Sequence, residues 1–259
     1  MHTVLDIPHA AAAIGASFLA GAINSVAGGG TLVSFPTLIW LGLNSVGANA
    51  TSTVAIWPGT VGSVWGYRKE LRGLDSRFLA MVVPSLAGGL LGAWLLRFTP
   101  PALFDRLVPY LILFATLLFM VQEPVQRLLK TADAARHRSR RWFIGGLCFQ
   151  FVVGLYGGYF GAGIGILMLA ALSILGLEDI HEMNALKAIL AGSVNGIAAI
   201  YFVWEQMVYW PYVLIMAVAA ITGGVGGAGT ARRMGRTAVR RLVVAIGFIM
   251  AVSLFLKAH

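Results

Sequence analysis

Charged side chains are scarce in this sequence of 259 residues. Lys, Arg, Asp and Glu make up 11% of the chain, whereas hydrophobic residues make up 58% and the mean hydropathy is +0.82; soluble domains contain about 25% charged residues. None of the four occurs in 7–67, 142–177 or 206–231, and each run exceeds the roughly 20 residues that a helix needs to cross a bilayer. These absences exclude a soluble protein and predict an all-α polytopic membrane protein.

Cysteine is almost absent, and carboxylates are absent from the apolar runs. The one cysteine, Cys148, lies in an apolar run, so the chain offers no internal disulfide or thiolate metal site, and we expect a buried thiol. All ten Asp and Glu residues lie in predicted joints or at segment ends, which leaves no carboxylate proton relay. Without a Ser/His/Asp set, metal cluster or paired carboxylates at membrane depth, we predict no enzyme, cofactor or metal site.

The basic residues indicate topology. A net charge of +9 would suggest nucleic acid in a soluble protein, but most of the 19 basic residues lie in joints 68–77, 127–141 and 232–241. Such joints face the cytoplasm, whereas the uncharged joint after Trp204 should lie outside. The N-terminus lacks a positive region and a cleavage site, so we expect no removed signal peptide. These features predict a multi-pass protein of the bacterial inner membrane, with the lipid bilayer and no nucleic acid as partner.

The chain matches itself at an offset of about 134 residues, which is the mark of an internal repeat. Phe18 matches Phe151, and the glycine pair at Gly88 matches the pair at Gly223. The strings GGLLGA and GGVGGAG that begin at these pairs predict close helix packing, not a nucleotide loop. The predicted units are a first transmembrane repeat at 1–122, a basic cytoplasmic linker at 123–141 and a second transmembrane repeat at 142–259.

Each half contains five apolar segments, of which the first two are short and joined by glycines. The segments are 9–27, 31–43, 49–67, 77–97, 102–122, 142–160, 163–177, 184–204, 211–231 and 238–256. Gly is costly inside a helix, and irregular backbone at membrane depth survives only beside protein or a wet cavity. Each short pair therefore predicts a glycine-broken or re-entrant hairpin before three crossing helices. The basic joints favour inverted repeats; a break within a single crossing would give a parallel repeat.

Inverted repeats with matched interruptions are typical of secondary transporters, whose sites form at the repeat interface. At a glycine break the backbone can approach a ligand, and a helix that starts there directs free N–H groups at an anion; tight helix packing is the alternative role. The polar residues of 49–53 and 184–187 either bind the ligand or cap helices. The expected substrate-binding residues are Asn24, Ser25, Gly28, Gly29, Gly30, Ser34, Pro36, Asn49, Thr51, Ser52, Thr53, Tyr156, Gly161, Gly163, Asn184, Lys187, Ser193 and Asn195.

Lys187 is the one expected site residue that carries a charge. It lies about one turn inside an apolar segment, where an ionisable side chain is expensive enough to be a functional candidate. Its ammonium would attract an anion, although the side chain could instead extend to the interface near Glu182. Either the membrane potential or a cation held by carbonyls and hydroxyls could drive transport. Trp57 and Tyr212, at predicted segment ends, are expected to be interfacial anchors.

Several strings together resemble the sulfite exporter TauE/SafE family of bacterial membrane proteins. They are AGAINSVAGGGTLVSFP, GANATSTVAIWPG and VWGYRKEL in the first half, and GLYGGYFGAGIGILML and NALKAILAGSVNGIAAIYF in the second. The resemblance spans nearly the whole chain. It implies export of sulfite, sulfoacetate or another organosulfur anion.

The sequence thus predicts a secondary transporter that moves small anions outward. Two alternatives stay open, a passive anion channel and a transporter of an unrelated small metabolite. Assembly as a homo-oligomer is also left open.

Overall fold

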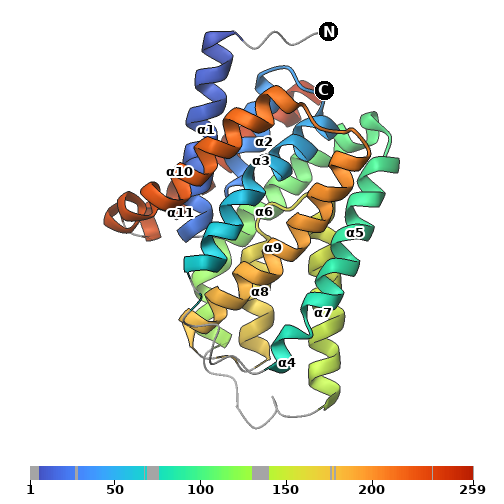
Figure 1. The fold of residues 1–259 in the computed structure, drawn as a ribbon, viewed down its shortest axis with the longest axis vertical. Helices are drawn as coiled ribbons and strands as arrows, with labels where there is room; N and C mark the ends of the chain where they lie inside the picture. Colours follow the sequence, from blue (N-terminus) through green and yellow to red (C-terminus); the bar gives the residue numbers. More distant parts are fainter. Residues whose placement is uncertain are drawn as a thin grey trace.

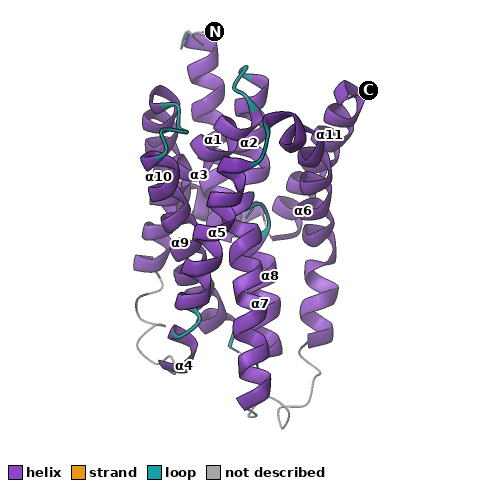
Figure 2. Cartoon of the chain, turned by 90° about the vertical axis from the view of Figure 1, so that its right-hand side faces the viewer, coloured by secondary structure: helices purple, strands orange, loops and turns teal. Residues whose placement is uncertain are grey.

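The structure is a computed structural model that describes residues 6–26, 29–66, 68, 76–129, 140–175, 177, 179–234 and 236–258. The regular structure of these residues is helical, with no strand among them (Figure 2). The helices are α1 Ile7–Val26, α2 Thr31–Trp40, α3 Ser45–Gly66, α4 Ser76–Leu79, α5 Val82–Phe98, α6 Pro101–Leu129, α7 Arg140–Tyr159, α8 Ile164–Ile174, α9 Ile180–Trp204, α10 Trp210–Met234 and α11 Arg236–Ala258.

Nine of the ten predicted segments each coincide with one helix, whereas the predicted segment 77–97 is divided into α4 and α5 by a turn at Ala80 and Met81. α6 continues to Leu129 and α7 begins at Arg140, so both extend into the predicted linker at 123–141; residues 130–139 lie outside the described chain. α1, α5, α6 and α9 contain stretches long and apolar enough to cross a membrane, and α2, α7, α8, α10 and α11 contain shorter apolar stretches.

The short helices of each half fold back on their neighbours, as predicted for hairpins. α2 packs along α1, and α8 packs along α7 (Figure 1). A Cβ atom added at Gly30 would overlap the carbonyl of Ala20, which shows how closely the start of α2 approaches α1.

Two helix pairs join the two halves, and in each pair the backbones of the two helices are in direct contact. α1 packs against α10, and α7 packs against α5. A Cβ atom at Gly223 of α10 would overlap the carbonyl of Phe18, and one at Gly88 of α5 would overlap the carbonyl of Phe151. These four residues are the ones matched in the sequence repeat, so the same contact occurs twice, and the predicted role in packing is confirmed for Gly88 and Gly223.

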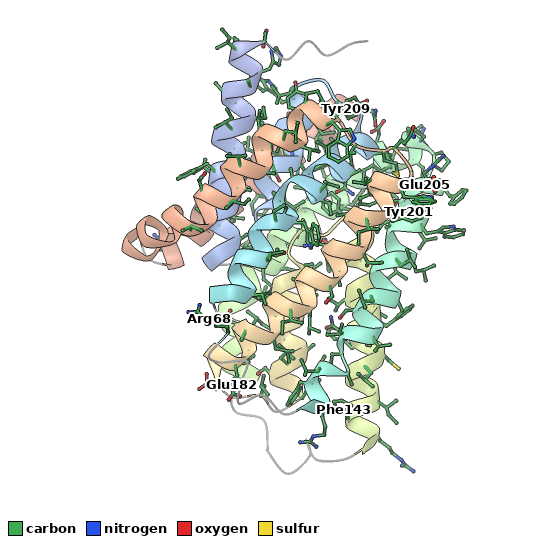
Figure 3. The ribbon with its side chains drawn as sticks, viewed as in Figure 1. Arg68, Phe143, Glu182, Tyr201, Glu205 and Tyr209 are labelled. Carbon is green, nitrogen blue, oxygen red and sulfur yellow. The ribbon has the colours of Figure 1, made fainter. Side chains whose placement is uncertain are left out.

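α3 and α9, which occupy matched places in the repeat, pack against each other in opposite directions. Arg68, just past the end of α3, lies at the same end of the molecule as Glu182 near the start of α9, whereas Tyr209 lies at the other end (Figure 3). The Asn44 amide, just before α3, donates a hydrogen bond to the Tyr209 hydroxyl at 3.0 Å. The matched helices are therefore antiparallel.

The outer surface is apolar, which overturns one expectation. Cys148 is exposed on α7 and is not the buried thiol that its apolar run suggested. Large apolar side chains are exposed as well, among them Leu214, Val218 and Ile249. In a bilayer the lipid-facing surface is as apolar as the interior, so an apolar run does not distinguish the two faces of a helix.

Candidate functional site

The first break joins α1 to α2 and is held by Asn24. The backbone N–H of Gly30 donates a hydrogen bond to Asn24 Oδ1 at 2.8 Å. α2 then begins with Gly30 as its N-cap and no side-chain capping bond. Of the other expected residues here, Gly28 and the side chain of Ser25 lie outside the described residues.

The second break joins α7 to α8 through a glycine-dependent turn. Gly161 and Gly163 have φ angles of 81° and 78°, which is the left-handed region that glycine adopts without strain. The Tyr156 hydroxyl donates a hydrogen bond to the carbonyl of Ala162 at 2.8 Å and so holds the turn. α8 begins after Gly163, again with no side-chain capping bond.

Both breaks contact the same stretch of α6. A Cβ atom at Gly29 would overlap the ring of Phe119, and one at Gly163 would lie 3.6 Å from the Cα and Cβ atoms of Ala115. Residues 115 and 119 are one turn apart on a helix, about 6 Å along its axis. The two interrupted hairpins, which are far apart in the sequence, therefore meet around one short segment.

Hydrogen bonds from α3 connect the two breaks. Asn49 Nδ2 donates to the carbonyl of Tyr159, the last residue of α7, at 3.0 Å. One turn further along α3, Ser52 Oγ lies 2.6 Å from Ser34 Oγ of α2, and the Ser34 hydroxyl donates to the carbonyl of Gly30 at 3.3 Å. Asn49, Ser52 and Ser34 are all buried. Asn24, Gly30, Ser34 and Ser52 are thus linked by hydrogen bonds at the first break, and Asn49 bonds to the second.

The second-half residues lie along α9. Lys187 is buried, with 8% of its surface exposed, and its ammonium donates a hydrogen bond to Asn184 Oδ1 at 2.9 Å. Asn195 lies about 12 Å further along the helix axis, where its Oδ1 would be 3.7 Å from a Cβ atom at Gly161. The Ser193 hydroxyl donates to the carbonyl of Ile189 within the same helix.

Three expected residues make contacts other than those of a shared polar site. Thr51 Oγ1 accepts a hydrogen bond from the backbone N–H of Tyr209 at 3.0 Å, which ties α3 to the turn before α10. The Thr53 hydroxyl donates to the carbonyl of Asn49 in its own helix. Pro36 is buried within α2.

Trp57 makes a contact between helices that the sequence did not predict. It lies in the middle of α3, where its indole N–H donates a hydrogen bond to the carbonyl of Gly192 of α9 at 3.0 Å. Its ring also lies against Gly196. The expectation of an interfacial anchor is therefore wrong for Trp57, and also for Tyr212, which is 2% exposed. Gly192 and Gly196, four residues apart on α9, are a sequence signal for this close packing.

A polar cavity of about 570 Å³ opens at the end of the molecule that holds Tyr209 and Glu205 (Figure 3). It lies among the turns between α2 and α3, α5 and α6, and α9 and α10. Arg97 Nε lies 3.0 Å from Glu205 Oε2 in an ion pair. Thr99 Oγ1, which lines this cavity, lies 3.2 Å from the hydroxyl oxygen of Tyr159. The backbone carbonyl of the same tyrosine accepts the hydrogen bond from Asn49.

Comparison with known proteins places this arrangement among membrane transporters. The family model described as Sulfite exporter TauE/SafE matches residues 13–254. The chain is 27% identical over 235 residues to a "Probable membrane transporter protein" of Haemophilus influenzae, covering 90% of this chain and 89% of that one. It is 25% identical over 240 residues to a "Probable membrane transporter protein ORF9" of Sinorhizobium sp, covering 92% and 89%.

A third relative is "Probable membrane transporter protein YfcA" of Escherichia coli, 24% identical over 248 residues, covering 94% of this chain and 88% of that one. No solved structure matches this chain.

Proposed function

Because this chain belongs to the sulfite exporter TauE/SafE family, we propose that it is a secondary transporter that exports small anions, namely sulfite or an organosulfonate such as sulfoacetate. It would act as a multi-pass protein of the bacterial inner membrane. Its relatives are named as membrane transporters, and the four candidate membrane-spanning helices in the described part of the chain support a membrane location.

The convergence of the two breaks on α6 is the observation that carries the proposal. α2 and α8 begin there, and neither start is capped by a side chain. A helix start carries about half a positive charge. At α2 the N–H groups of Gly30, Leu32 and Val33 already donate to Asn24 Oδ1 and to the carbonyls of Gly29 and Gly30, so this start acts mainly through its dipole. Two positive dipole ends beside one segment favour a small anion, because its charge is opposite to both.

Lys187 supports the same chemistry. A lysine that is 8% exposed in a helical membrane protein would be costly without a partner, and Asn184 Oδ1 supplies one acceptor. We propose that its ammonium meets the anion during the transport cycle on the side of the molecule where α9 begins. Burial argues against a side chain that extends to the membrane interface.

We further propose that the two halves are inverted repeats. The antiparallel course of α3 and α9 supports this, as do the matched contacts of Gly88 and Gly223. Inversion would give the protein two related hairpins that enter from opposite sides, and alternating access would follow when one half rocks against the other.

The test uses purified protein in vesicles loaded with radiolabelled sulfite or sulfoacetate. We expect Lys187→Gln to lower the flux by about tenfold or more, since a hydrogen bond to a charged group contributes about 1.5–3 kcal/mol. Lys187→Arg should retain part of the flux. Arg241→Gln removes one positive charge at an exposed position of α11 and is the matched control. Wild-type flux in Lys187→Gln would show that this assignment is wrong.

A further inference from the structure

The amide of Asn49 presents an acceptor, not a donor, to its surroundings. Its Nδ2 group must face the Tyr159 carbonyl, because a carbonyl can only accept a hydrogen bond. That orientation fixes Oδ1 on the other side of the amide. Asn49 is 1% exposed, and no group in the described part of the chain donates a hydrogen bond to this oxygen. A buried acceptor without a donor costs about 1–3 kcal/mol, so a ligand that fits it must be a cation or a donor.

Ser52 presents a second acceptor from the same face of α3. Ser52 Oγ and Ser34 Oγ lie 2.6 Å apart, and either hydroxyl can donate in this contact. In either arrangement Ser52 Oγ retains at least one lone pair that can act as an acceptor. Residues 49 and 52 are neighbours on one helical face, and both are buried. Two oxygen acceptors therefore lie on one face of α3, and no cation among the described residues bonds to Asn49 Oδ1.

The second half shows what occupies the matched place. Asn49 and Ser52 correspond in the repeat to Asn184 and Lys187. There the Lys187 ammonium lies 2.9 Å from Asn184 Oδ1. The second half thus carries its own cation at the asparagine oxygen, whereas the first half has a serine, whose side chain is too short to bring a charge to Asn49.

The end of α7 adds a favourable field. Asn49 bonds to the carbonyl of Tyr159, the last residue of that helix, and a helix C-terminus carries about half a negative charge. In transporters with interrupted helices, such ends and unwound carbonyls are where small cations are held. We propose that Asn49 Oδ1 and Ser52 Oγ bind a small monovalent cation, with sodium as the probe, at the place that the Lys187 ammonium takes in the other half.

The cation site is separate in chemistry from the anion site, which uses helix starts. Its use as a coupling ion rests on the proposed anion transport, but its occupancy by sodium does not. The experiment therefore measures the thermal unfolding midpoint, Tm, of the purified full chain without sulfite, in sodium chloride and in N-methylglucamine chloride at equal ionic strength.

We expect the Tm of the wild type to rise by roughly 2–5 °C for each tenfold increase of sodium above its dissociation constant. Asn49→Ala should lose this increment because it lacks the oxygen. Ser52→Lys should lose it as well, because the new ammonium takes the place of sodium, as Lys187 does in the second half. Gln150→Met is the matched control, since Gln150 is another fully buried amide with an unpartnered oxygen, on α7; it should keep the increment.

Equal Tm values of the wild type in the two salts would overturn the cation site, and so would an increment that survives in Asn49→Ala or Ser52→Lys. A protein that moves sulfite but shows no sodium effect would leave the anion transport standing and remove the cation site. A protein that shows the sodium effect but moves no anion would leave the cation site standing and remove the proposed anion transport.

Discussion

Replacement of Gly29 by alanine tests whether the first break packs directly on α6. The backbone of Gly29 is outside the left-handed region, so alanine is penalised only by its methyl group. That methyl would overlap the Phe119 ring, which is fully buried in the main core. Overpacking of this kind costs about 1–3 kcal/mol, and Phe119→Ala alone should cost about 3–5 kcal/mol because it leaves a cavity. In the double variant the methyl enters that cavity, so we expect the double to cost about 1–3 kcal/mol less than the sum.

The measurement is the free energy of unfolding in mixed detergent micelles for the four members of this cycle. Gly15→Ala on α1 is the control, because nothing lies within 4 Å of the new methyl; it should be neutral or more stable by about 0.5–1 kcal/mol. Additive effects of Gly29→Ala and Phe119→Ala would refute the contact, and with it the convergence of the two breaks on α6.

Further predictions concern the helix contacts and the orientation of the chain. Gly223→Ala should lower the free energy of unfolding by about 1–3 kcal/mol, because its methyl overlaps the backbone of α1. Trp57→Phe should lower it by about 1 kcal/mol through loss of the bond to α9. Arg97→Gln should change it by less than about 1 kcal/mol, since that ion pair is solvent-exposed. In a Cys148→Ser background, an impermeant thiol reagent added to intact cells should label the Gln206→Cys variant. It should label the Arg68→Cys variant only after permeabilisation.

The helices could be predicted from the sequence because each apolar run must satisfy its backbone hydrogen bonds internally. Nine of the ten predicted segments each correspond to one helix, and the tenth, 77–97, corresponds to α4 and α5. The linker was less accurate, since α6 extends to Leu129. The predicted segment ended with the uncharged run at residue 122, and Pro124 disfavours a continued helix, yet α6 includes it. A helix that leaves the membrane can continue in water.

The partners of the polar residues could not be predicted. Asn49, Thr51 and Ser52 are neighbours in one polar string, yet Asn49 and Ser52 face the two breaks and Thr51 faces the turn before α10. Helical spacing predicts that these side chains diverge but not what each one meets. The Tyr159 carbonyl belongs to the backbone, so residue type gives no indication that it receives the Asn49 amide.

The exposure of individual side chains could not be predicted either. Hydropathy places Cys148 in a membrane helix but cannot assign it to the lipid face, since lipid and protein interior are both apolar. Trp57 was grouped with the aromatic residues at segment ends, although the predicted segment 49–67 and α3 both place it near the middle of the helix.

Carrier-mediated anion transport is tested most directly by counterflow. Vesicles that contain the purified protein and a high concentration of unlabelled sulfite are diluted into a trace of radiolabelled sulfite. A carrier with one alternating site predicts transient accumulation of label above its equilibrium level, with a rate that saturates as sulfite increases. Label that only equilibrates, at a rate proportional to its concentration, would identify a passive pore and contradict the proposed transport mechanism.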